Sequence, residues 1–167
     1  MLKLRKNKKG FTLVELIVVI AIMAVLAGTV AGVTVSQLNK QTDKTMATEA
    51  KGIADFISTW IIENNIDLTA DGVTTLDSIT TAGTNGQKLM DALKAQYGEE
   101  KVGEDAEAGK TIGVSFVAGG TEATPDKTKN VIKVEYEGKQ SGTKGDVSYT
   151  VNAEGVVAKV TPAAAQG

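Results

Sequence analysis

The chain has 167 residues, a net charge of −2, and 42% hydrophobic but only 4% aromatic side chains. It contains neither cysteine nor histidine. Disulfides and thiolate metal sites are therefore excluded, and the commonest general base and metal ligand is missing. The length suits one domain. Few aromatic residues beside 18 glycines favour a small, loop-rich β domain over an enzyme with a deep aromatic pocket.

Positive charge is concentrated at the N-terminus. The first nine residues hold five basic and no acidic side chains, which leaves 13 of the 18 basic residues against all 20 acidic ones in the rest of the chain. The five are Lys3, Arg5, Lys6, Lys8 and Lys9. A basic N-terminus followed by an apolar segment predicts membrane targeting, with the basic end in the cytoplasm.

An uncharged segment of 20 residues runs from Leu16 to Val35. As a helix it would span ~30 Å, the thickness of a bilayer core. It is longer than the ~7–15 apolar residues of a cleaved secretory signal, and no A-x-A cleavage site clearly follows it. We therefore expect a membrane helix that stays in the mature protein.

Glu15 interrupts the apolar block that begins at Phe11. An ionisable group in a membrane segment is costly, about 2.5–3.5 kcal/mol at the helix centre, so such a residue is a candidate functional group. Because Glu15 lies near the end of the segment, its carboxylate could also simply reach water at the cytoplasmic edge. The residues alone leave both interpretations open.

The residues around Glu15 resemble the class III leader junction of type IV prepilins and pseudopilins. An apolar helix follows directly on the string Lys8-Lys9-Gly10-Phe11-Thr12-Leu13-Val14-Glu15-Leu16. In that family a membrane aspartyl peptidase cuts after the glycine, here Gly10, and the same enzyme methylates the new N-terminal residue, here Phe11. The resemblance also implies that Glu15 pairs with the Phe11 amine of a neighbouring subunit, because within one helix we expect that amine to lie more than a turn away.

The resemblance implies a structural subunit of a type IV pilus, with no enzymatic activity, cofactor or metal. Its partners would be further copies, other pilins, the prepilin peptidase/methyltransferase, and the assembly platform with its ATPase. It would be a single-pass membrane precursor and later part of an extracellular filament. The alternative within the family is a pseudopilin of a type II secretion or DNA-uptake machine. An anchored enzyme would need a Ser–Lys or carboxylate site, and no spacing singles one out.

Two glycines stand where many major pilins carry a proline, about twenty residues into the mature helix. Gly28 and Gly32 leave major pilin, minor pilin and pseudopilin undecided. Their four-residue spacing would let membrane helices pack closely. Each also costs a helix about 1 kcal/mol relative to alanine, which predicts a soft point where the helix could unwind under load.

The helical pattern continues beyond the membrane segment. We predict a leader over residues 1–10 and one helix over 11–64, of which 11–35 is the transmembrane and filament-core part. Its second half carries an apolar stripe at steps of three or four: Val35, Leu38, Thr42, Met46, Ala50, Ile53, Ile57 and Ile61. Asp43 is among the residues placed off this stripe. Asn64-Asn65 is the expected stop, and a separate coiled-coil stalk is the alternative.

The remaining chain predicts a globular α+β head over residues 65–161 and a flexible tail over 162–167. Gln87–Tyr97 has the pattern of a short helix, with Thr84 or Asn85 as its cap. Alternating apolar residues then predict a three- or four-stranded antiparallel sheet that covers the helical stripe. The expected inward residues are Ile112, Val114, Phe116, Ile132, Val134, Tyr136, Val147, Tyr149, Val151, Val156, Ala158 and Val160.

Charged loops offer weaker hypotheses. Asp67-x-Thr69-x-Asp71-Gly72 resembles the start of a calcium loop, but Ser78 stands where the closing glutamate belongs, so no metal is expected. A basic set is interrupted by acids and poor in aromatics, so no nucleic-acid partner is expected: Lys127, Lys129, Lys133, Lys139 and Lys144. An acidic set could meet it between neighbouring heads, or both could be solvated surface: Glu99, Glu100, Glu104, Asp105 and Glu107.

Overall fold

The computed structural model describes residues 10–76, 78, 85–121, 124–140 and 144–160. Most of the predicted leader, the predicted tail and the candidate cap Thr84 lie outside these residues. The chain divides into two compact units, residues 1–38 and residues 39–167. Each unit is described by itself below.

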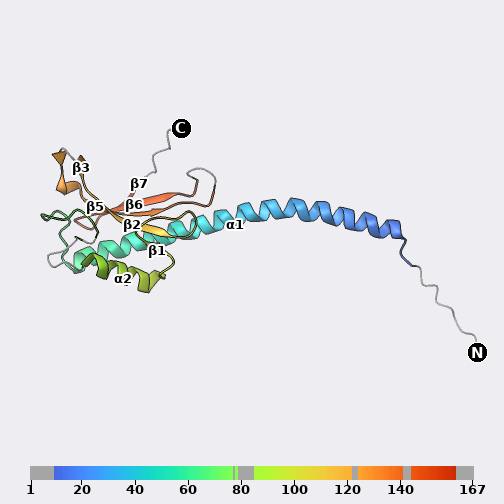
Figure 1. Cartoon of the computed structure of the whole chain (residues 1–167), viewed down its shortest axis with the longest axis horizontal. Coiled ribbons are helices and arrows are strands. Elements are labelled where there is room, and N and C mark those ends of the chain that lie inside the picture. The colour runs from blue at the N-terminus through green and yellow to red at the C-terminus, as the bar shows by residue number, and fades with distance from the viewer. Residues whose placement is uncertain (1–9, 77, 79–84, 122–123, 141–143, 161–167) are drawn as a thin grey trace, which may run out of the picture. The chain divides into compact units, whose positions relative to one another are not determined.

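The first helix, α1, runs from Leu13 to Glu63 and contains 51 residues (Figure 1). It is the one described helix that is long and apolar enough to cross a membrane. The predicted stop is confirmed: Asn65 has a positive φ of 50°, and the Ile66 amide donates to the Ile61 carbonyl at 2.9 Å. Asparagine tolerates this left-handed conformation, which satisfies a carbonyl at the helix end.

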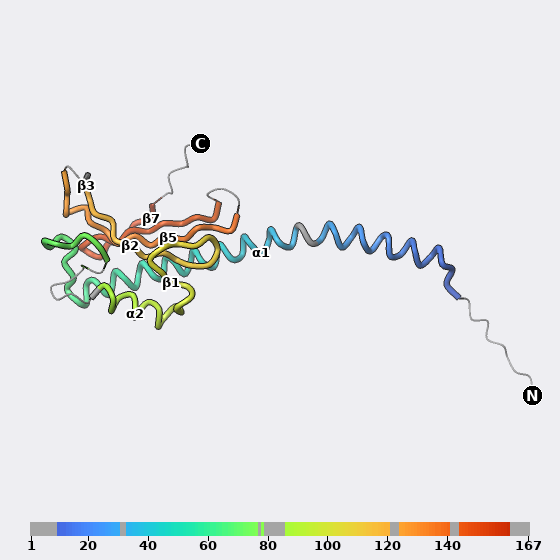
Figure 2. The backbone as a smooth tube through the Cα atoms, viewed as in Figure 1, coloured from blue at the N-terminus to red at the C-terminus, as the bar shows by residue number. Residues whose placement is uncertain are grey.

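The head contains a five-stranded sheet with the order β1-β2-β5-β6-β7. Figure 2 shows strands of this sheet beside the second half of α1. All neighbouring strands are antiparallel except β1 and β2, which are parallel. The strands are β1 Val102–Gly103, β2 Ile112–Val117, β5 Val131–Tyr136, β6 Val147–Asn152 and β7 Val157–Val160. The predicted count of three or four was too low because β1 has only two residues, inside a glycine-rich acidic segment that we assigned to a loop.

Three smaller elements complete the described part of the head. The second helix, α2, spans Asn85–Tyr97; the pattern predicted it from Gln87, and Asn85, a candidate cap, is already helical. A two-stranded ribbon pairs β3, Gly120–Thr121, with β4, Thr124–Pro125, and the short 3-10 helix η1, Lys127–Lys129, follows it. The α+β fold class is therefore confirmed.

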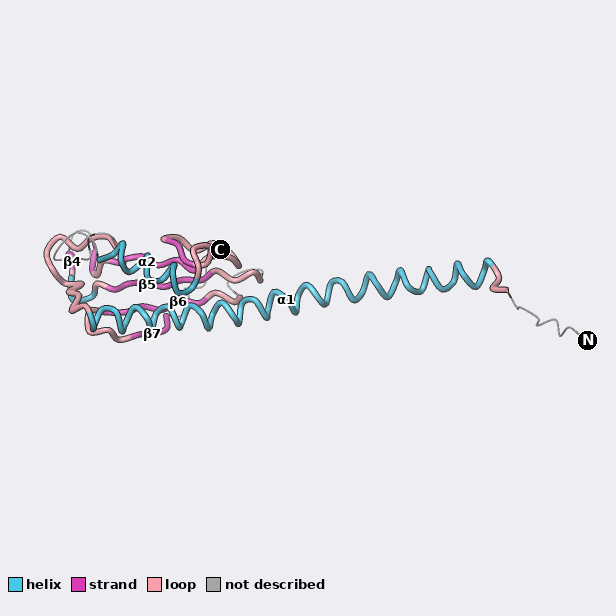
Figure 3. The backbone as a smooth tube through the Cα atoms, turned by 90° about the horizontal axis from the view of Figure 1, so that it is seen from below, coloured by secondary structure: helices cyan, strands magenta, loops and turns pink. Residues whose placement is uncertain are grey.

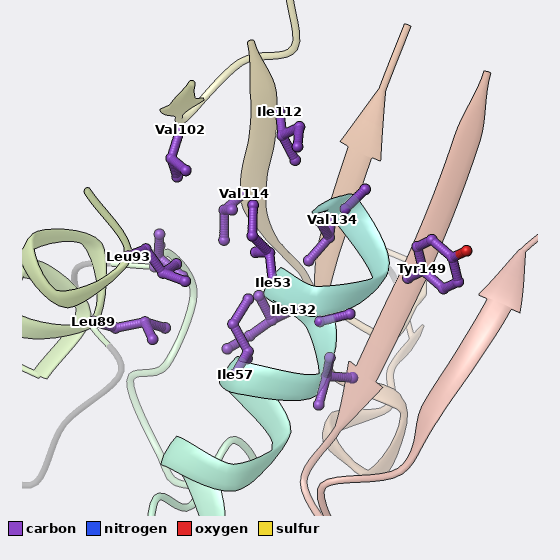
Figure 4. Packing of buried hydrophobic residues seen from close by; sticks show 14 of the residues in the cluster. Ile53, Ile57, Leu89, Leu93, Val102, Ile112, Val114, Ile132, Val134 and Tyr149 are labelled. Atoms are coloured by element: carbon purple, nitrogen blue, oxygen red, sulfur yellow. The ribbon is translucent and has the colours of Figure 1, made fainter. Parts of the chain in front are cut away.

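One hydrophobic core joins α1, α2 and the sheet within the second unit (Figure 4). The C-terminal half of α1 lies alongside the strands (Figure 3). Ile53 and Ile57 of α1 are fully buried, as are Ile132 and Val134 of β5. Burial alternates along β5, so every second side chain points to the helix, as the period-two pattern predicted.

The last strand has the opposite phase to the prediction. Val156, Ala158 and Val160 are exposed, whereas Val157 packs against the core. The turn before β7 causes the difference, because Gly155 has a φ of +74° and its amide donates to the Asn152 carbonyl at 3.0 Å. A shift of one residue exchanges the two faces of a strand.

The apolar stripe of α1 also begins later than predicted. Val35 and Leu38 are 58% and 60% exposed, so they do not belong to it. Asp43, which we placed off the stripe, is buried and 3% exposed. It lies three residues before buried Met46 and so continues the steps of three and four toward the N-terminus.

Candidate processing and assembly site

The N-terminus of α1 is closed by a capping box. Thr12 directly precedes the helix, and its amide and its Oγ1 each donate a hydrogen bond to Oε2 of Glu15 at 2.9 Å. The Glu15 amide donates in return to Oγ1 of Thr12 at 3.3 Å. Threonine at the N-cap and glutamate three residues later is the combination that satisfies orphan amides reciprocally.

The capping box turns the Glu15 carboxylate toward the residues just before the helix. Its carboxylate reaches the amide of Thr12, which is the residue after Phe11. In a chain cut after Gly10, the new amine would therefore start one residue from this contact. Any further partner of Glu15 would compete with these intrachain hydrogen bonds.

The Gly10–Phe11 peptide bond lies in an open stretch of chain before the helix. Phe11 is 89% exposed, and a Cβ built on Gly10 would have no neighbour within 4 Å. The fold of the chain itself therefore places no demand for glycine at position 10. A demand for glycine there would have to come from a partner that approaches the backbone.

The membrane segment is an unbroken helix through both candidate glycines. A Cβ built on Gly28 would meet no atom within 4 Å, so this face is free to approach another helix. The surroundings of Gly32 lie outside what the structure describes. Nearby hydroxyls bond to the helix backbone, Thr29 to the Leu26 carbonyl at 3.0 Å and Thr34 to the Val30 carbonyl at 2.9 Å. Such bonds satisfy polar groups where lipid offers none.

The calcium-like loop is occupied by its own hydrogen bonds. Oδ1 of Asp67 accepts from the Thr69 amide at 2.8 Å and from Thr69 Oγ1 at 2.6 Å, and these bonds lower the pKa of Asp67. Asp71 forms an ion pair with Lys127. The described residues contain no group of three acidic, histidine or cysteine side chains that could hold a metal ion.

Ion pairs within the chain already engage much of the predicted basic set. Lys129 lies 2.8 Å from Asp126, and Lys133 lies 2.7 Å from Glu135. Lys101, the one base among the acidic residues, lies 2.8 Å from Glu49 of α1. Within the described head, Lys139 and Lys144 are the members of the basic set without an ion pair.

Asp43 is a site residue that the sequence analysis missed. Its Oδ1 accepts from the Tyr136 hydroxyl and the Lys139 amide, and its Oδ2 accepts from Nε2 of Gln140, each at 2.8 Å. Burial disfavours the ionised form, but these hydrogen bonds outweigh it and hold the pKa of Asp43 below its usual value. Its spacing of three residues from Met46 was a sequence signal for burial that was missed. Its hydrogen-bond donors, Tyr136, Lys139 and Gln140, lie 93 to 97 positions further along the chain, so nothing in the sequence indicated them.

The comparisons with known proteins agree with the geometry of the N-terminus. Residues 5–31 match the family model described as the prokaryotic N-terminal methylation motif, and the match includes Gly10, Phe11, Glu15 and Gly28. Searches of the curated proteins and of the solved structures find no match. The motif implies processing by a prepilin peptidase, and the long apolar helix fits a membrane-anchored precursor. Residues 5–31 therefore carry the prepilin-type methylation motif, the class III leader of type IV pilins, at the start of a long apolar helix.

Proposed function

We propose that the protein is a structural subunit of a type IV pilus. The observation that carries the proposal is the methylation motif over residues 5–31, placed directly before a long apolar helix that continues into an α+β head. The precursor is held in the cytoplasmic membrane. After processing, its N-terminal helix enters the filament core and the head forms the extracellular surface.

In the proposed pathway the peptidase cuts between Gly10 and Phe11 and methylates the Phe11 amine, which stays cationic. In the precursor, the hydrogen bonds from Thr12 satisfy the Glu15 carboxylate. In a packed filament core a carboxylate without a cation would cost several kcal/mol. Glu15 therefore exchanges part of its cap for the amine of a neighbouring subunit, and this pairing sets the axial offset of the next copy.

The experiment compares Glu15→Ala with Glu63→Ala, which removes an exposed glutamate at the other end of α1. Glu15→Ala should insert into the membrane and be cleaved normally but should be largely absent from sheared filaments. Glu63→Ala should assemble like the unmodified chain. Normal filament incorporation of Glu15→Ala would refute the pairing role, because no charge would then be needed at position 15.

A second candidate is a pseudopilin of a type II secretion or DNA-uptake machine. It stays open because Gly28 stands in the region where many major pilins have proline, which leaves major pilin, minor pilin and pseudopilin undecided. The two functions differ in their product. A major pilin forms the bulk of long surface filaments, whereas a pseudopilin supports export or uptake without them, so electron microscopy of sheared material with mass spectrometry of its subunits separates the two.

A further inference from the structure

Asp43 is met by the end of β5 and by described residues that follow it before β6. Three donors from Tyr136, Lys139 and Gln140 meet its two oxygens at 2.8 Å. On another side the backbone of Gly145, with a φ of +91°, lies so close that a Cβ there would come within 2.5 Å of Oδ2. These described residues therefore fit closely around a carboxylate that α1 supplies.

Asp43 is also the point where α1 enters the core. Among the described residues of α1 before it, none is buried, whereas Met46 and Ala50 directly after it are buried. Its partners lie 93 to 97 positions further along the chain. The first firm contact between the helix and the rest of the head is thus polar and directional.

The apolar contacts that follow are poorly suited to resist sliding of the helix along its axis. A step of four residues toward the N-terminus would bring Ala54 to the site of Ala50. The same step would bring Ile57 to the site of Ile53, and Ile61 to that of Ile57. Burial of like residues is not directional, so these three sites would be refilled. Ser58, which would reach the site of buried Ala54, would lose its half-buried hydrogen bond to the Gly155 carbonyl, and a larger cost falls at the end of the stripe that holds Asp43.

At the end of the stripe nearest the membrane segment, the cost of sliding comes from Asp43. After the same step Ala47 would stand at its site, and the Tyr136 hydroxyl, the Lys139 amide and the Gln140 amide would lose their acceptor. Buried donors without a partner are costly, and bonds to a charged group are stronger than neutral ones. Breaking the exposed Glu49–Lys101 ion pair would cost much less, because water can solvate both charges.

We propose that Asp43 is the axial stop of α1, the contact that prevents the helix from being drawn out of the head by tension. In a filament subunit tension acts along α1, and this part of the argument rests on the proposed function. The stop itself is a property of the single head. It can therefore fail or hold independently of filament formation.

The experiment measures how long the head resists a constant force in two directions, with the full-length chain in detergent micelles. The chain has no cysteine, so introduced pairs are specific attachment points. Lys40→Cys with Glu154→Cys loads α1 against the sheet, because Glu154 neighbours Gly155, whose carbonyl accepts a hydrogen bond from Ser58 near the far end of α1. Val117→Cys with Lys159→Cys loads β2 against β7 and leaves α1 out.

Each attachment pair is combined with Asp43→Asn and, as a control, with Asp55→Asn, an exposed acid of the same helix paired with Lys51. Asp43→Asn should shorten the lifetime under load about tenfold or more in the helix direction, the value of one hydrogen bond to a charged group, and little in the sheet direction. Asp55→Asn should change neither. If Asp43→Asn shortens both lifetimes equally, Asp43 is a general stabiliser and the proposal is wrong.

A milder variant keeps the test decisive if Asp43→Asn does not fold. Tyr136→Phe removes one donor from the network and leaves the carboxylate and the buried ring in place. It should shorten the lifetime only in the helix direction, by less than Asp43→Asn does. An unchanged lifetime in that direction, for either variant in a folded chain, overturns the axial stop.

Discussion

Glu15 and Asp43 of α1 show how a carboxylate can serve two different purposes in one helix. Glu15 is exposed and caps its own helix through Thr12, so its hydrogen bonds can be exchanged for another partner. Asp43 is buried and accepts from three donors, one at the end of β5 and two in the segment that follows it. We interpret the first as an assembly contact and the second as a permanent anchor.

Asp43 should make the head sensitive to acid. Because its hydrogen bonds lower its pKa in the folded chain, the stabilisation is present above the unfolded value of about 3.9 and is lost as pH falls through the lower folded value. Between pH 5 and pH 3 the melting temperature should therefore fall more for the unmodified chain than for Asp43→Asn. At pH 7 the variant should melt at the lower temperature.

Thermal melts by circular dichroism over this pH range provide the measurement. Other carboxylates with lowered pKa values, including Asp67 and Asp126, also lose stabilising contacts in acid. Both chains share this loss, so only the difference between their melting temperatures reports on Asp43. Parallel pH profiles for the two chains would contradict the role of its charge.

At the scale of elements, α1 is one continuous helix, but its helical conformation is less stable at some positions than at others. It is continuous from Leu13 to Glu63, but Gly28 and Gly32 each cost about 1 kcal/mol relative to alanine. In lipid the helix stays intact because its backbone has no water to bond with. In a filament we expect the segment around these glycines to unwind first.

Replacing both glycines should stiffen the filament. Gly28→Ala with Gly32→Ala should raise the force needed to extend single filaments, because the helix between them becomes more stable than the unwound form. Force–extension curves of sheared filaments test this. An unchanged curve, or a filament reconstruction with unbroken helix through residues 26–34 in the unmodified protein, would show that the glycines serve another purpose, such as close packing.

The helices and strands also show which parts of the fold the sequence predicted and which it did not. Strong periodicity correctly predicted α1, α2 and the inward faces of β5 and β6, because burial imposes it. The phase of β7 was missed because Gly155 reorients the chain just before it. The burial of Asp43 was missed because its donors, such as Tyr136, are brought there only by the fold. The Thr12–Glu15 capping box was predictable from its spacing and was overlooked.

At the scale of the whole molecule, the charged surfaces of the head bear on how subunits meet. We still expect the acidic set, which includes Glu99, Glu100 and Glu104, to contact a neighbouring head. The intrachain ion pairs of Lys129 and Lys133 change the expected partner. Lys139 and Lys144, which make no ion pair in the described part of the head, are better placed to serve it.

Charge reversal tests this contact. Changing Glu99, Glu100 and Glu104 to lysine should lower filament yield and salt tolerance. Changing Lys139 and Lys144 to glutamate in the same chain should restore part of both. The effects should be modest, because exposed pairs are worth ~0–1 kcal/mol each, and they should fade in high salt. If the first change leaves yield and salt tolerance unaltered, the acidic set faces solvent.

The central claim is that this chain is cut after Gly10, methylated and polymerised. The most direct measurement is mass spectrometry of the N-terminal peptide of the subunit in filaments sheared from cells, beside the same analysis of a Gly10→Val chain. We predict that the filament subunit begins with N-methylated Phe11 and that Gly10→Val keeps its leader and stays in the membrane. A filament subunit that begins at Met1, or a Gly10→Val chain that matures and assembles normally, would contradict the account.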